Sequence, residues 1–214
     1  MSMNIKIGII DCNFGNIASL LNSIKYLGYD FQVIEKTKKL DNFTHLILPG
    51  VGSFNKAAKK LRNTGWSDEI NEFVIKSKPF LGICLGMQLL FDSSSENGDE
   101  QGLGLFRGKC EKFSNGLNLS LPHIGFNLVD NPKTKIWKNI PNNSPFYFVH
   151  SFRVLLNDQT KGEDVNNPQT SKTHYGEKFI SFIENKNIFG AQFHPEKSHK
   201  LGLNLIKNFV ELIK

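Results

Sequence analysis

The sequence predicts an α/β domain in which a mostly parallel sheet is covered by helices on both faces, followed by a more antiparallel, β-rich second half. In the first half, short apolar runs alternate with segments whose apolar residues recur every three or four positions. The short runs are apolar along their whole length, as is typical of parallel strands buried on both faces. After Gly98, strand-like runs follow one another with polar turns between them.

Strands and helices are expected to alternate in the first half. The expected strands cover residues 5–10, 31–35, 44–48 and 79–83, and the expected helices cover residues 17–27, 53–62 and 67–77. Gly28 ends the apolar period of the first helix, and glycine is common just past a helix end. Ser67 is expected to be the N-cap of the third helix, with Asp68 and Glu69 in the first turn, where carboxylates complement the helix dipole.

The second half is expected to be richer in strands. Strand-like runs cover residues 107–113, 122–129, 145–156, 178–184 and 187–194, and a final helix is expected over residues 200–214. Residues 157–171 contain one apolar residue, Val165, and are predicted to be a flexible loop. Because no internal repeat or long linker divides the chain, we expect one domain over residues 1–214.

Composition excludes several classes of protein. No apolar run approaches the roughly 20 residues of a membrane span, and the N-terminus lacks the pattern of a secretory signal, so a cytoplasmic protein is expected. The net charge of +6 comes mostly from scattered lysines, which argues against nucleic-acid binding. Three cysteines without a CxxC pair predict neither a disulfide framework nor a zinc site.

Cys84 lies in the segment GICLGMQ, residues 82–88, directly after the last apolar run of the first half. A strand, a cysteine flanked by glycines and a helical segment (MQLLF, residues 87–91) form the layout of a nucleophile elbow. A helix that begins just after Cys84 would direct N–H groups at the sulfur, favouring a thiolate and stabilising an oxyanion. Free cysteine is also among the most buried residue types, so a purely structural Cys84 stays an open alternative.

His194 is the candidate base for this nucleophile, because it is followed two residues later by Glu196 in the segment QFHPEKS. In an extended segment, residues two positions apart project to the same side, and Pro195 restricts the backbone between them. Glu196 would then fix the imidazole tautomer while the other ring nitrogen faces the sulfur. The alternative is a surface turn in which the histidine and the glutamate are incidental.

The segment LPGVGSF, residues 48–54, ends the strand predicted over residues 44–48. In a doubly wound sheet, ligands bind beyond the carboxyl ends of the strands, so this glycine loop is expected to lie at the same edge as the elbow. Its N–H groups would be available to complete an oxyanion hole. An ordinary glycine turn is the alternative, since many such turns have this composition.

Together these residues resemble the class I (triad) glutamine amidotransferases, which have a flavodoxin-like α/β fold. Within them, the closest resemblance is to the glutaminase subunits of imidazole glycerol phosphate synthases. The likeness covers essentially the whole chain, through the segments IGIIDCNFGN, LPGVGSF, GICLGMQLLF, SSSENGDEQGLGLF, PHIGFN, FYFVHS, HYGEKF and QFHPEKSHKLGLNLIKNF, in family order.

The resemblance implies that Cys84 attacks the side-chain amide of L-glutamine, His194 passes a proton to the departing ammonia, and Glu196 orients His194. Water then hydrolyses the glutamyl thioester. The backbone N–H groups of Gly52 and Leu85 would form the oxyanion hole, and a change in the 50–52 loop would switch activity. The residues implied to contact glutamine are Gly50, Gln88, Glu96, Tyr147, Val149, His150 and Ser151. No cofactor and no metal ion are implied.

The resemblance also implies a partner, a (β/α)8-barrel cyclase subunit that forms a heterodimer with this chain and receives ammonia through a tunnel. The residues implied to face it are Asn13, Asn16, Phe126 and Lys197. Two segments depart from the usual family pattern: CNFGN replaces forms such as YGxGN, and PHIGFN replaces PHMGWN. Phe126 therefore lacks the indole N–H that the usual tryptophan offers.

Two other functions stay open at this point. The segment EKSHKLG is similar to paralogues that supply ammonia for the amination of a surface or flagellar sugar. A non-catalytic binding module on the same fold would keep the elbow as architecture only. Cys12 and Cys110 have no motif histidine beside them and are expected to be structural.

Overall fold

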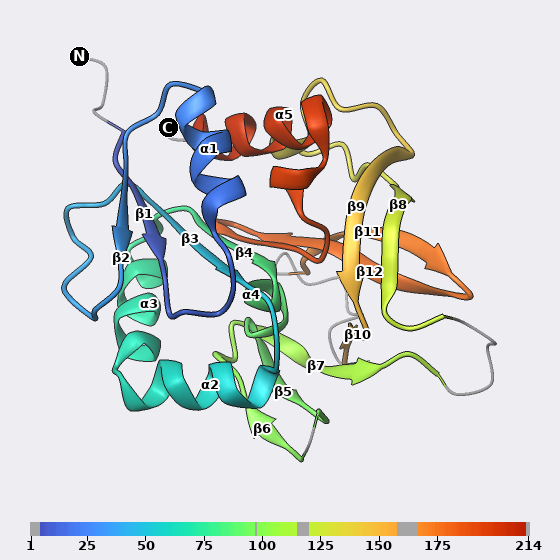
Figure 1. Ribbon diagram of the computed structural model, residues 1–214, viewed down its shortest axis with the longest axis horizontal. Coiled ribbons are helices and arrows are strands. Elements are labelled where there is room, and N and C mark those ends of the chain that lie inside the picture. Colours follow the sequence, from blue (N-terminus) through green and yellow to red (C-terminus); the bar gives the residue numbers. More distant parts are fainter. Residues whose placement is uncertain (1–4, 97, 115–119, 158–166, 213–214) are drawn as a thin grey trace.

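The computed structural model of the chain describes residues 5–96, 98–114, 120–157 and 167–212 (Figure 1). Its helices are α1 Ala18–Tyr26, α2 Phe54–Asn63, α3 Trp66–Ile75, α4 Leu85–Gln88 and α5 His199–Val210, with short 3₁₀ helices η1 Lys135–Trp137 and η3 Pro195–Lys197. The strands are β1 Ile7–Ile10, β2 Phe31–Ile34, β3 His45–Gly50, β4 Phe80–Cys84, β5 Phe91–Ser94, β6 Glu100–Gln101, β7 Phe106–Lys112, β8 His123–Val129, β9 Ser144–His150, β10 Phe152–Leu156, β11 Gln169–Tyr175, β12 Glu177–Asn185 and β13 Ile188–Ala191.

The parallel part of the main sheet has the strand order β2-β1-β3-β4-β13, and each neighbouring pair in it is parallel. An order that begins 2-1-3-4 is that of the doubly wound sheets, so the predicted α/β fold is confirmed. All carboxyl ends of these strands lie at one edge, where Gly50 of β3 pairs with Cys84 of β4. The elbow and the glycine loop therefore share the edge at which they were expected.

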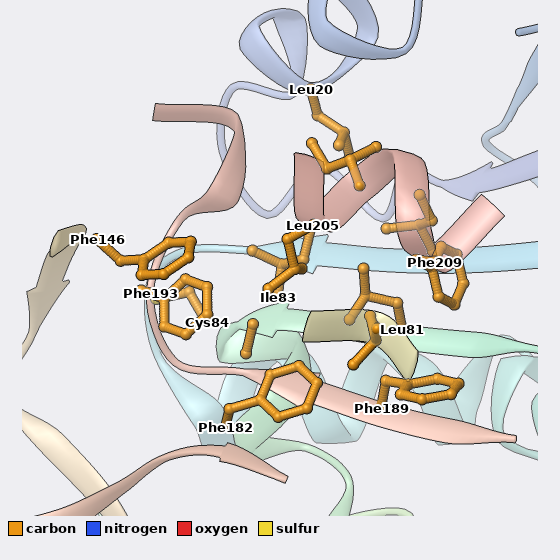
Figure 2. Close-up of a cluster of buried hydrophobic side chains, with 14 of the residues drawn as sticks. Leu20, Leu81, Ile83, Cys84, Phe146, Phe182, Phe189, Phe193, Leu205 and Phe209 are labelled. Atoms are coloured by element: carbon orange, nitrogen blue, oxygen red, sulfur yellow. The ribbon is translucent and has the colours of Figure 1, made fainter. Parts of the chain in front are cut away.

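Helices cover both faces of this parallel part (Figure 1). α1 and α5 contribute to a buried cluster on one face, and α2 and α3 contribute to a second cluster on the other. Residues of β3 alternate between them, since Ile47 belongs to the first cluster while Leu46 and Leu48 belong to the second. Burial from both sides explains why these strands are apolar along their whole length. Figure 2 shows Cys84 among the side chains of the first cluster.

The second half adds antiparallel strands, as predicted. β12 pairs antiparallel with β13, β10 and β11, and β10 pairs antiparallel with β7. β8 and β9 pair only with each other among the described strands and form a separate two-stranded ribbon. The prediction of one strand over residues 145–156 is therefore wrong. The chain leaves the ribbon at His150 and enters the main sheet at Phe152, so Ser151 marks a change of sheet that the apolar pattern does not reveal.

The N-cap predicted at Ser67 is also wrong. α3 begins at Trp66 with Gly65 as its N-cap, and Gly65 has a φ of 77°. Because glycine adopts this left-handed conformation readily, the chain turns from α2 into α3 within two residues and Trp66 is buried in the first turn. Asp68 and Glu69 lie in the first turn, as predicted.

Other boundaries differ from the prediction. Residues 158–166 of the loop predicted over 157–171 lie outside the described residues. The last three residues of that loop belong to β11, a mostly polar strand that pairs antiparallel with β12. β5 and β6 were not predicted, because their residues are mostly polar. The last helix, α5, ends at Val210 rather than at residue 214. None of the helices described is long and apolar enough to cross a membrane.

Candidate active site

Cys84 occupies a sharp turn between β4 and α4. Its backbone has a φ of 53° and a ψ of −108°, a conformation that costs free energy for any residue other than glycine. The flanking glycines permit it. A Cβ on Gly86 would lie 1.8 Å from the carbonyl oxygen of Leu48, and a Cβ on Gly82 would lie 2.5 Å from that of Gly86. The predicted elbow geometry is therefore present, and the glycines are required by close approach of the backbone.

The helix after the elbow is shorter than the segment 87–91 suggested. α4 is one turn long, and Phe91 already belongs to β5. The chain extends there because the carbonyl groups of Leu89 and Leu90 accept N–H groups from Leu103 and Leu105. One turn carries little of a helix dipole. The groups of α4 that are available to the sulfur are its unpaired first N–H groups, beginning with that of Leu85.

His194 and Glu196 lie together as expected, but the backbone between them is not extended. Nδ1 of His194 donates to Oε1 of Glu196 over 2.7 Å. His194 itself is extended, and its N–H donates to the carbonyl of Tyr147 over 2.8 Å. Pro195 then opens η3, because its fixed φ suits the first position of a helical turn. The carboxylate reaches the imidazole across this turn.

His194 also interacts with Cys84. Burial by itself lowers the pKa of His194, but the interactions with Cys84 and with Glu196 outweigh it and raise the pKa to about 10. The second ring nitrogen, Nε2, is buried and has no hydrogen-bond partner among the described residues. One ring nitrogen is thus held by a carboxylate while the ring interacts electrostatically with the sulfur. Sulfur, imidazole and carboxylate converge as the sequence predicted.

A cavity of about 70 Å³ lies beside Cys84. It is lined by Val51, Gly52, Cys84, Leu85, Gln88, Glu96, Val149, His150, Ser151 and Phe152. Most of the residues predicted to form the oxyanion hole or to contact the substrate therefore line one cavity, although they come from widely separated segments. Two predicted residues do not line it. Gly50 lies next to Cys84 in the sheet, and Tyr147 lies on β9 beside His194.

The cavity is small compared with the roughly 300–1,000 Å³ of typical ligand pockets. Its rim is held by the 51–52 loop, where the N–H of Val51 donates to the carbonyl of Phe14 over 2.8 Å. Gly15 allows this contact, since a Cβ there would lie 2.2 Å from the Val51 side chain. Gly52 has a φ of 111°, which favours glycine. The 51–52 loop is therefore fastened to the loop between β1 and α1.

Glu96 has a structural contact besides lining the cavity. Its Oε2 accepts the N–H of Phe54, the first residue of α2, over 2.7 Å. A carboxylate at a helix N-terminus satisfies an unpaired N–H and complements the dipole. Glu96 therefore ties the cavity wall to α2, which follows directly on the 51–52 loop.

His150 belongs to a buried hydrogen-bond chain. Its Nδ1 donates to the carbonyl of Phe152 over 2.7 Å, and its Nε2 lies 3.0 Å from Nδ1 of His123. Nε2 of His123 in turn lies 3.3 Å from Nδ2 of Asn127, an amide nitrogen, which can only donate, so Nε2 of His123 is the acceptor. Burial lowers the pKa of His150 to about 3 and that of His123 to about 4, so both rings are neutral at pH 7.

Gln192 contacts the sulfur and was not predicted. Its fully buried side chain donates through Nε2 to Sγ of Cys84 over 3.7 Å, and its Oε1 accepts Nε2 of Gln88 over 3.0 Å. A signal existed in the sequence, since Gln192 interrupts the apolar run NIFGAQF two positions before His194.

Cys12 and Cys110 are buried free cysteines. Burial raises the pKa of Cys12 to about 11, despite the nearby Lys60, and raises that of Cys110 still further. Both sulfurs are therefore held as thiols, which agrees with the structural role expected of them. In the part of the chain that the structure describes, no group of three His, Cys, Asp or Glu side chains is arranged to hold a metal ion.

The four residues predicted to face a partner lie in two places. Phe126 stacks on His199 with ring centroids 5.4 Å apart and meets Tyr147 edge to face at 5.5 Å, while the Lys197 ammonium lies 5.8 Å above the Tyr147 ring. Asn13 and Asn16 are exposed on the loop between β1 and α1. That loop also contains Phe14, the residue that binds Val51, so both groups adjoin the active-site edge.

The chain was compared with known families and structures. The model of the class I glutamine amidotransferases matches residues 8–212. The imidazole glycerol phosphate synthase subunit HisH of Caldanaerobacter subterraneus subsp. tengcongensis is 43% identical over 209 residues, which are 97% of this chain and 98% of that protein. The chloroplastic imidazole glycerol phosphate synthase hisHF of Arabidopsis thaliana is 38% identical over 202 residues, which are 94% of this chain and 33% of that longer protein.

A solved structure of PurLQS from Thermotoga maritima superimposes with a TM-score of 0.75 at 19% identity and covers 99% of this chain and 100% of that one, which shows the fold. The family match and the close relatives go further. The chain belongs to the class I glutamine amidotransferases and, within them, to the HisH subunits of imidazole glycerol phosphate synthase.

Proposed function

We propose that this chain hydrolyses L-glutamine to glutamate and ammonia and delivers the ammonia to a cyclase subunit that forms imidazole glycerol phosphate in histidine biosynthesis. The observation that carries the proposal is the convergence of three groups. Glu196 holds one nitrogen of His194 at 2.7 Å, and the interaction of His194 with Cys84 contributes to its raised pKa. That arrangement suits nucleophilic catalysis by a cysteine with a histidine as general acid and base.

In the first half of the reaction, the Cys84 thiolate attacks the side-chain amide carbon of glutamine. A carbon–sulfur bond forms, and the carbonyl oxygen becomes an oxyanion that accepts N–H groups of Leu85 and of the Gly52 loop. His194 donates its Nε2 proton to the amide nitrogen. The carbon–nitrogen bond then breaks, which releases ammonia and leaves a glutamyl thioester on Cys84.

In the second half, neutral His194 takes a proton from water through Nε2 while the water oxygen attacks the thioester carbon. The carbon–sulfur bond breaks, glutamate leaves, and Cys84 and His194 return to their starting state. Glu196 accepts the Nδ1 proton of His194 throughout, which keeps Nε2 directed at the reacting atoms.

The cavity lining supports recognition of glutamine as an amino acid. The Glu96 carboxylate suits the substrate ammonium group, and Gln88, His150 and Ser151 add hydrogen-bonding groups beside Cys84. Gly50 and Tyr147 do not line the cavity. Gly50 is proposed to hold the elbow in place, and Tyr147 is proposed to hold the His194 turn. Because the cavity is small, we expect the Val51–Phe14 contact to break when the 51–52 loop is activated.

The partner is proposed to bind the outer face of the β8–β9 ribbon. Ile124, Phe126 and Leu128 of β8 are 60%, 50% and 53% exposed and alternate along the strand, so they share one face. Their cross-strand partners are Val149, Tyr147 and Pro145. An apolar face of this kind resembles the core of a protein interface. Lys197, Asn13 and Asn16 would lie at its polar rim.

Val149 connects this face to the chemistry, since it belongs to the ribbon and also lines the cavity beside Cys84. Ammonia released there would leave next to the bound partner. The longer Arabidopsis relative, of which this chain matches one third, is named hisHF, which supports a HisF subunit as that partner. The resemblance implies that this subunit is a (β/α)8-barrel cyclase. The HisH names of the relatives favour the histidine pathway over a surface sugar as the destination of the ammonia.

The test is glutamate release from glutamine with and without the histidine-pathway cyclase. We expect release to rise when the cyclase is present and to fall by about 10⁴-fold or more in Cys84→Ser, because a missing nucleophile removes the covalent route. Cys110→Ser, which changes another buried cysteine in the same way, should keep the parental rate. A Cys84→Ser protein as active as the parent would refute the assignment.

The acceptor is tested separately by the formation of imidazole glycerol phosphate from the nucleotide intermediate. The complex of chain and cyclase should use glutamine as its nitrogen source, while the cyclase alone should need added ammonium. If the chain releases glutamate but does not bind this cyclase, its ammonia goes to another acceptor. Amination of a surface or flagellar sugar would then replace histidine biosynthesis as the proposed pathway.

A further inference from the structure

A chain of hydrogen bonds runs from a backbone carbonyl to the sulfur of Cys84 through two buried amides. Nε2 of Gln88 lies 3.2 Å from the carbonyl oxygen of Phe152 and 3.0 Å from Oε1 of Gln192. Nε2 of Gln192 lies 3.7 Å from the sulfur. Gln192 follows β13 directly and has no exposed surface, so its side chain cannot turn to solvent.

The direction of this chain is fixed at its start. A backbone carbonyl only accepts hydrogen bonds, so Gln88 must present its NH₂ group to Phe152. The second hydrogen of that group then faces Gln192, which must present its carbonyl oxygen. Gln192 is left with its NH₂ group toward Cys84. Turning either amide around would place two acceptors or two donors against each other in a buried site.

A second group contacts the sulfur and acts in the opposite sense. The carbonyl of Val149 lies 3.8 Å from Sγ and accepts the S–H of the thiol. A carbonyl favours the protonated sulfur, whereas an amide N–H favours the thiolate, because hydrogen bonds to charged acceptors are the stronger ones. The buried site strengthens both effects. The sulfur thus lies between a group that retains its proton and one that helps to release it.

We propose that Gln192 is a catalytic residue whose Nε2–H stabilises the Cys84 thiolate, and that Gln88 is a positioning residue that holds Gln192 in the required orientation. This inference rests on the proposed role of Cys84 as nucleophile. The thiolate takes part twice in each cycle, as the nucleophile that attacks glutamine and as the leaving group when the thioester is hydrolysed. Gln192 contacts the sulfur rather than the substrate, so its loss lowers kcat and leaves KM nearly unchanged.

The test uses the complete chain and two substitutions of similar length. Gln192→Met removes the donor, and Gln192→Glu keeps an oxygen for Gln88 but turns an acceptor toward the sulfur. Alkylation of Cys84 by iodoacetamide is followed against pH, with the labelled cysteine identified by mass spectrometry. His194 and Cys110 interact electrostatically with Cys84, and Glu96 and His150 line the cavity beside it. These four titratable residues stay unchanged in the variants.

We expect the midpoint of alkylation to rise by about one pH unit in Gln192→Met and by more in Gln192→Glu, because a donor to the charged form is lost or replaced by a repelling group. The kcat for glutamate release should fall about tenfold or more at pH 7, with KM within about twofold. Gln88→Met keeps Gln192 but frees its orientation, so a smaller rise in the midpoint is expected.

The control is Asn187→Asp, which also replaces a hydrogen-bonded amide by a carboxylic acid, at a half-buried position. Nδ2 of Asn187 donates to the carbonyls of Val74 and Lys78. Asn187 directly precedes β13 and pairs with the start of β4, so it lies at the opposite end of these strands from the elbow. The substitution should lower stability without moving the alkylation midpoint. A folded Gln192→Met protein with the parental midpoint and kcat would overturn the proposal, and so would a parental midpoint in folded Gln88→Met if Gln192→Met does not fold.

Alkylation needs neither glutamine nor a partner. Failure of the proposed function, seen as an active Cys84→Ser protein, is therefore distinguishable from failure of this inference, seen as an unchanged alkylation midpoint.

Discussion

The elbow at the end of β4 and the β8–β9 ribbon bury their apolar residues to very different extents. Leu81 and Ile83 of β4 are enclosed on both faces by strands and helices of the same chain. The ribbon is enclosed on one face only, where Phe146 and Phe148 are fully buried, and its other face is open. A region that buries itself can hold strained chemistry in place, whereas a half-covered region is available to a partner.

The two regions meet at Tyr147. Its ring lies on the open face of the ribbon, against Phe126 and Lys197. Its backbone carbonyl accepts the N–H of His194, and its N–H donates to Oγ of Ser198, over 2.8 and 3.0 Å respectively. A partner that contacts the ribbon would therefore act on the turn that carries His194. The difference between the regions shows how one chain can combine a rigid elbow at Cys84 with a His194 turn that a partner can reach.

The largest expected effect is at the elbow. Gly86→Ala would place a Cβ 1.8 Å from the carbonyl oxygen of Leu48, and a backbone contact of that kind cannot relax. We expect a loss of more than about 4 kcal/mol in the free energy of unfolding, or no folded protein. Gly125→Ala on the ribbon is the matched change. Its Cβ would meet nothing within 4 Å, and the positive φ of 125° alone costs about 1–2 kcal/mol.

Urea unfolding of both variants measures this difference. Equal losses would show that the elbow can relax and that its rigidity does not distinguish it from the ribbon.

The next effect concerns the carboxylate that holds the base. Glu196→Gln removes the charge that helps to raise the pKa of His194 and exchanges an acceptor for an amide that can present its NH₂ group to the ring. We expect kcat for glutamate release to fall about 10²–10⁴-fold, because the histidine loses its fixed tautomer. Stability should fall by about 3 kcal/mol, because the side chains of His194 and Glu196 are at least as buried as those of a buried ion pair elsewhere in the fold.

Glu177→Gln is the matched control. Glu177 pairs with the buried Arg153 at 2.8 Å in the antiparallel part of the sheet, so this variant should lose about 3 kcal/mol of stability and keep its activity. Similar activity losses in both variants would show that Glu196 acts through stability rather than through His194.

The sequence predicted the geometry of the elbow and of the HPE turn well because each has a local cause. The glycines around Cys84 are demanded by backbone contacts within a few residues, and the HPE turn brings Glu196 to His194 over two positions. The parallel strands were found because burial on both faces leaves an unbroken apolar run. These features depend on short segments, and a short segment is what a sequence pattern records.

The features that were missed depend on distant contacts. β9 and β10 form one apolar run, and only their different partners, β8 and β7, separate them at Ser151. In the sequence, Gln192 is only a polar residue that interrupts an apolar run. Its position between Gln88 and Cys84 is set by the fold. The N-cap at Gly65 was set by a tight connection that the cap preference of Ser67 does not report. Tertiary contacts decided each of these.

A third prediction concerns acid. Burial lowers the pKa of His123 to about 4 and that of His150 to about 3 in the ribbon, and lowers that of His45, the first residue of β3, to about 4. Their ordinary pKa is about 6.5, so below that pH the unfolded chain binds these protons more readily than the folded chain. Stability is therefore complete above about pH 6.5 and decreases as the pH falls toward 4, by about 2–3 kcal/mol for each well-buried ring.

Urea unfolding at pH 7 and pH 4.5 checks this, and hydrogen exchange locates the change. His45→Phe should remove the contribution of His45 to the loss of stability in acid and leave the contributions of His123 and His150 in the ribbon. If the ribbon is the weaker region, acid should first increase amide exchange in β8 and β9, ahead of β3 and β4. Exchange that rises equally in all four strands would mean that the two regions unfold as one unit.

The smallest expected effect on stability separates the two faces of the ribbon itself. Phe126→Ser changes a half-exposed ring, so the free energy of unfolding of the isolated chain should change by no more than about 0.5–1 kcal/mol. Phe146→Ser, on the buried face of the neighbouring strand, should lose about 3–5 kcal/mol through an empty cavity and a buried hydroxyl. The two faces should also differ in partner binding. Phe126→Ser should weaken the affinity for the cyclase at least about tenfold although stability is nearly unchanged, because aromatic residues often dominate the core of an interface. Isothermal titration with the cyclase measures this affinity. Parental affinity in Phe126→Ser, and also in Leu128→Ser on the same face, would remove the partner from the ribbon, and the open face would then need another occupant.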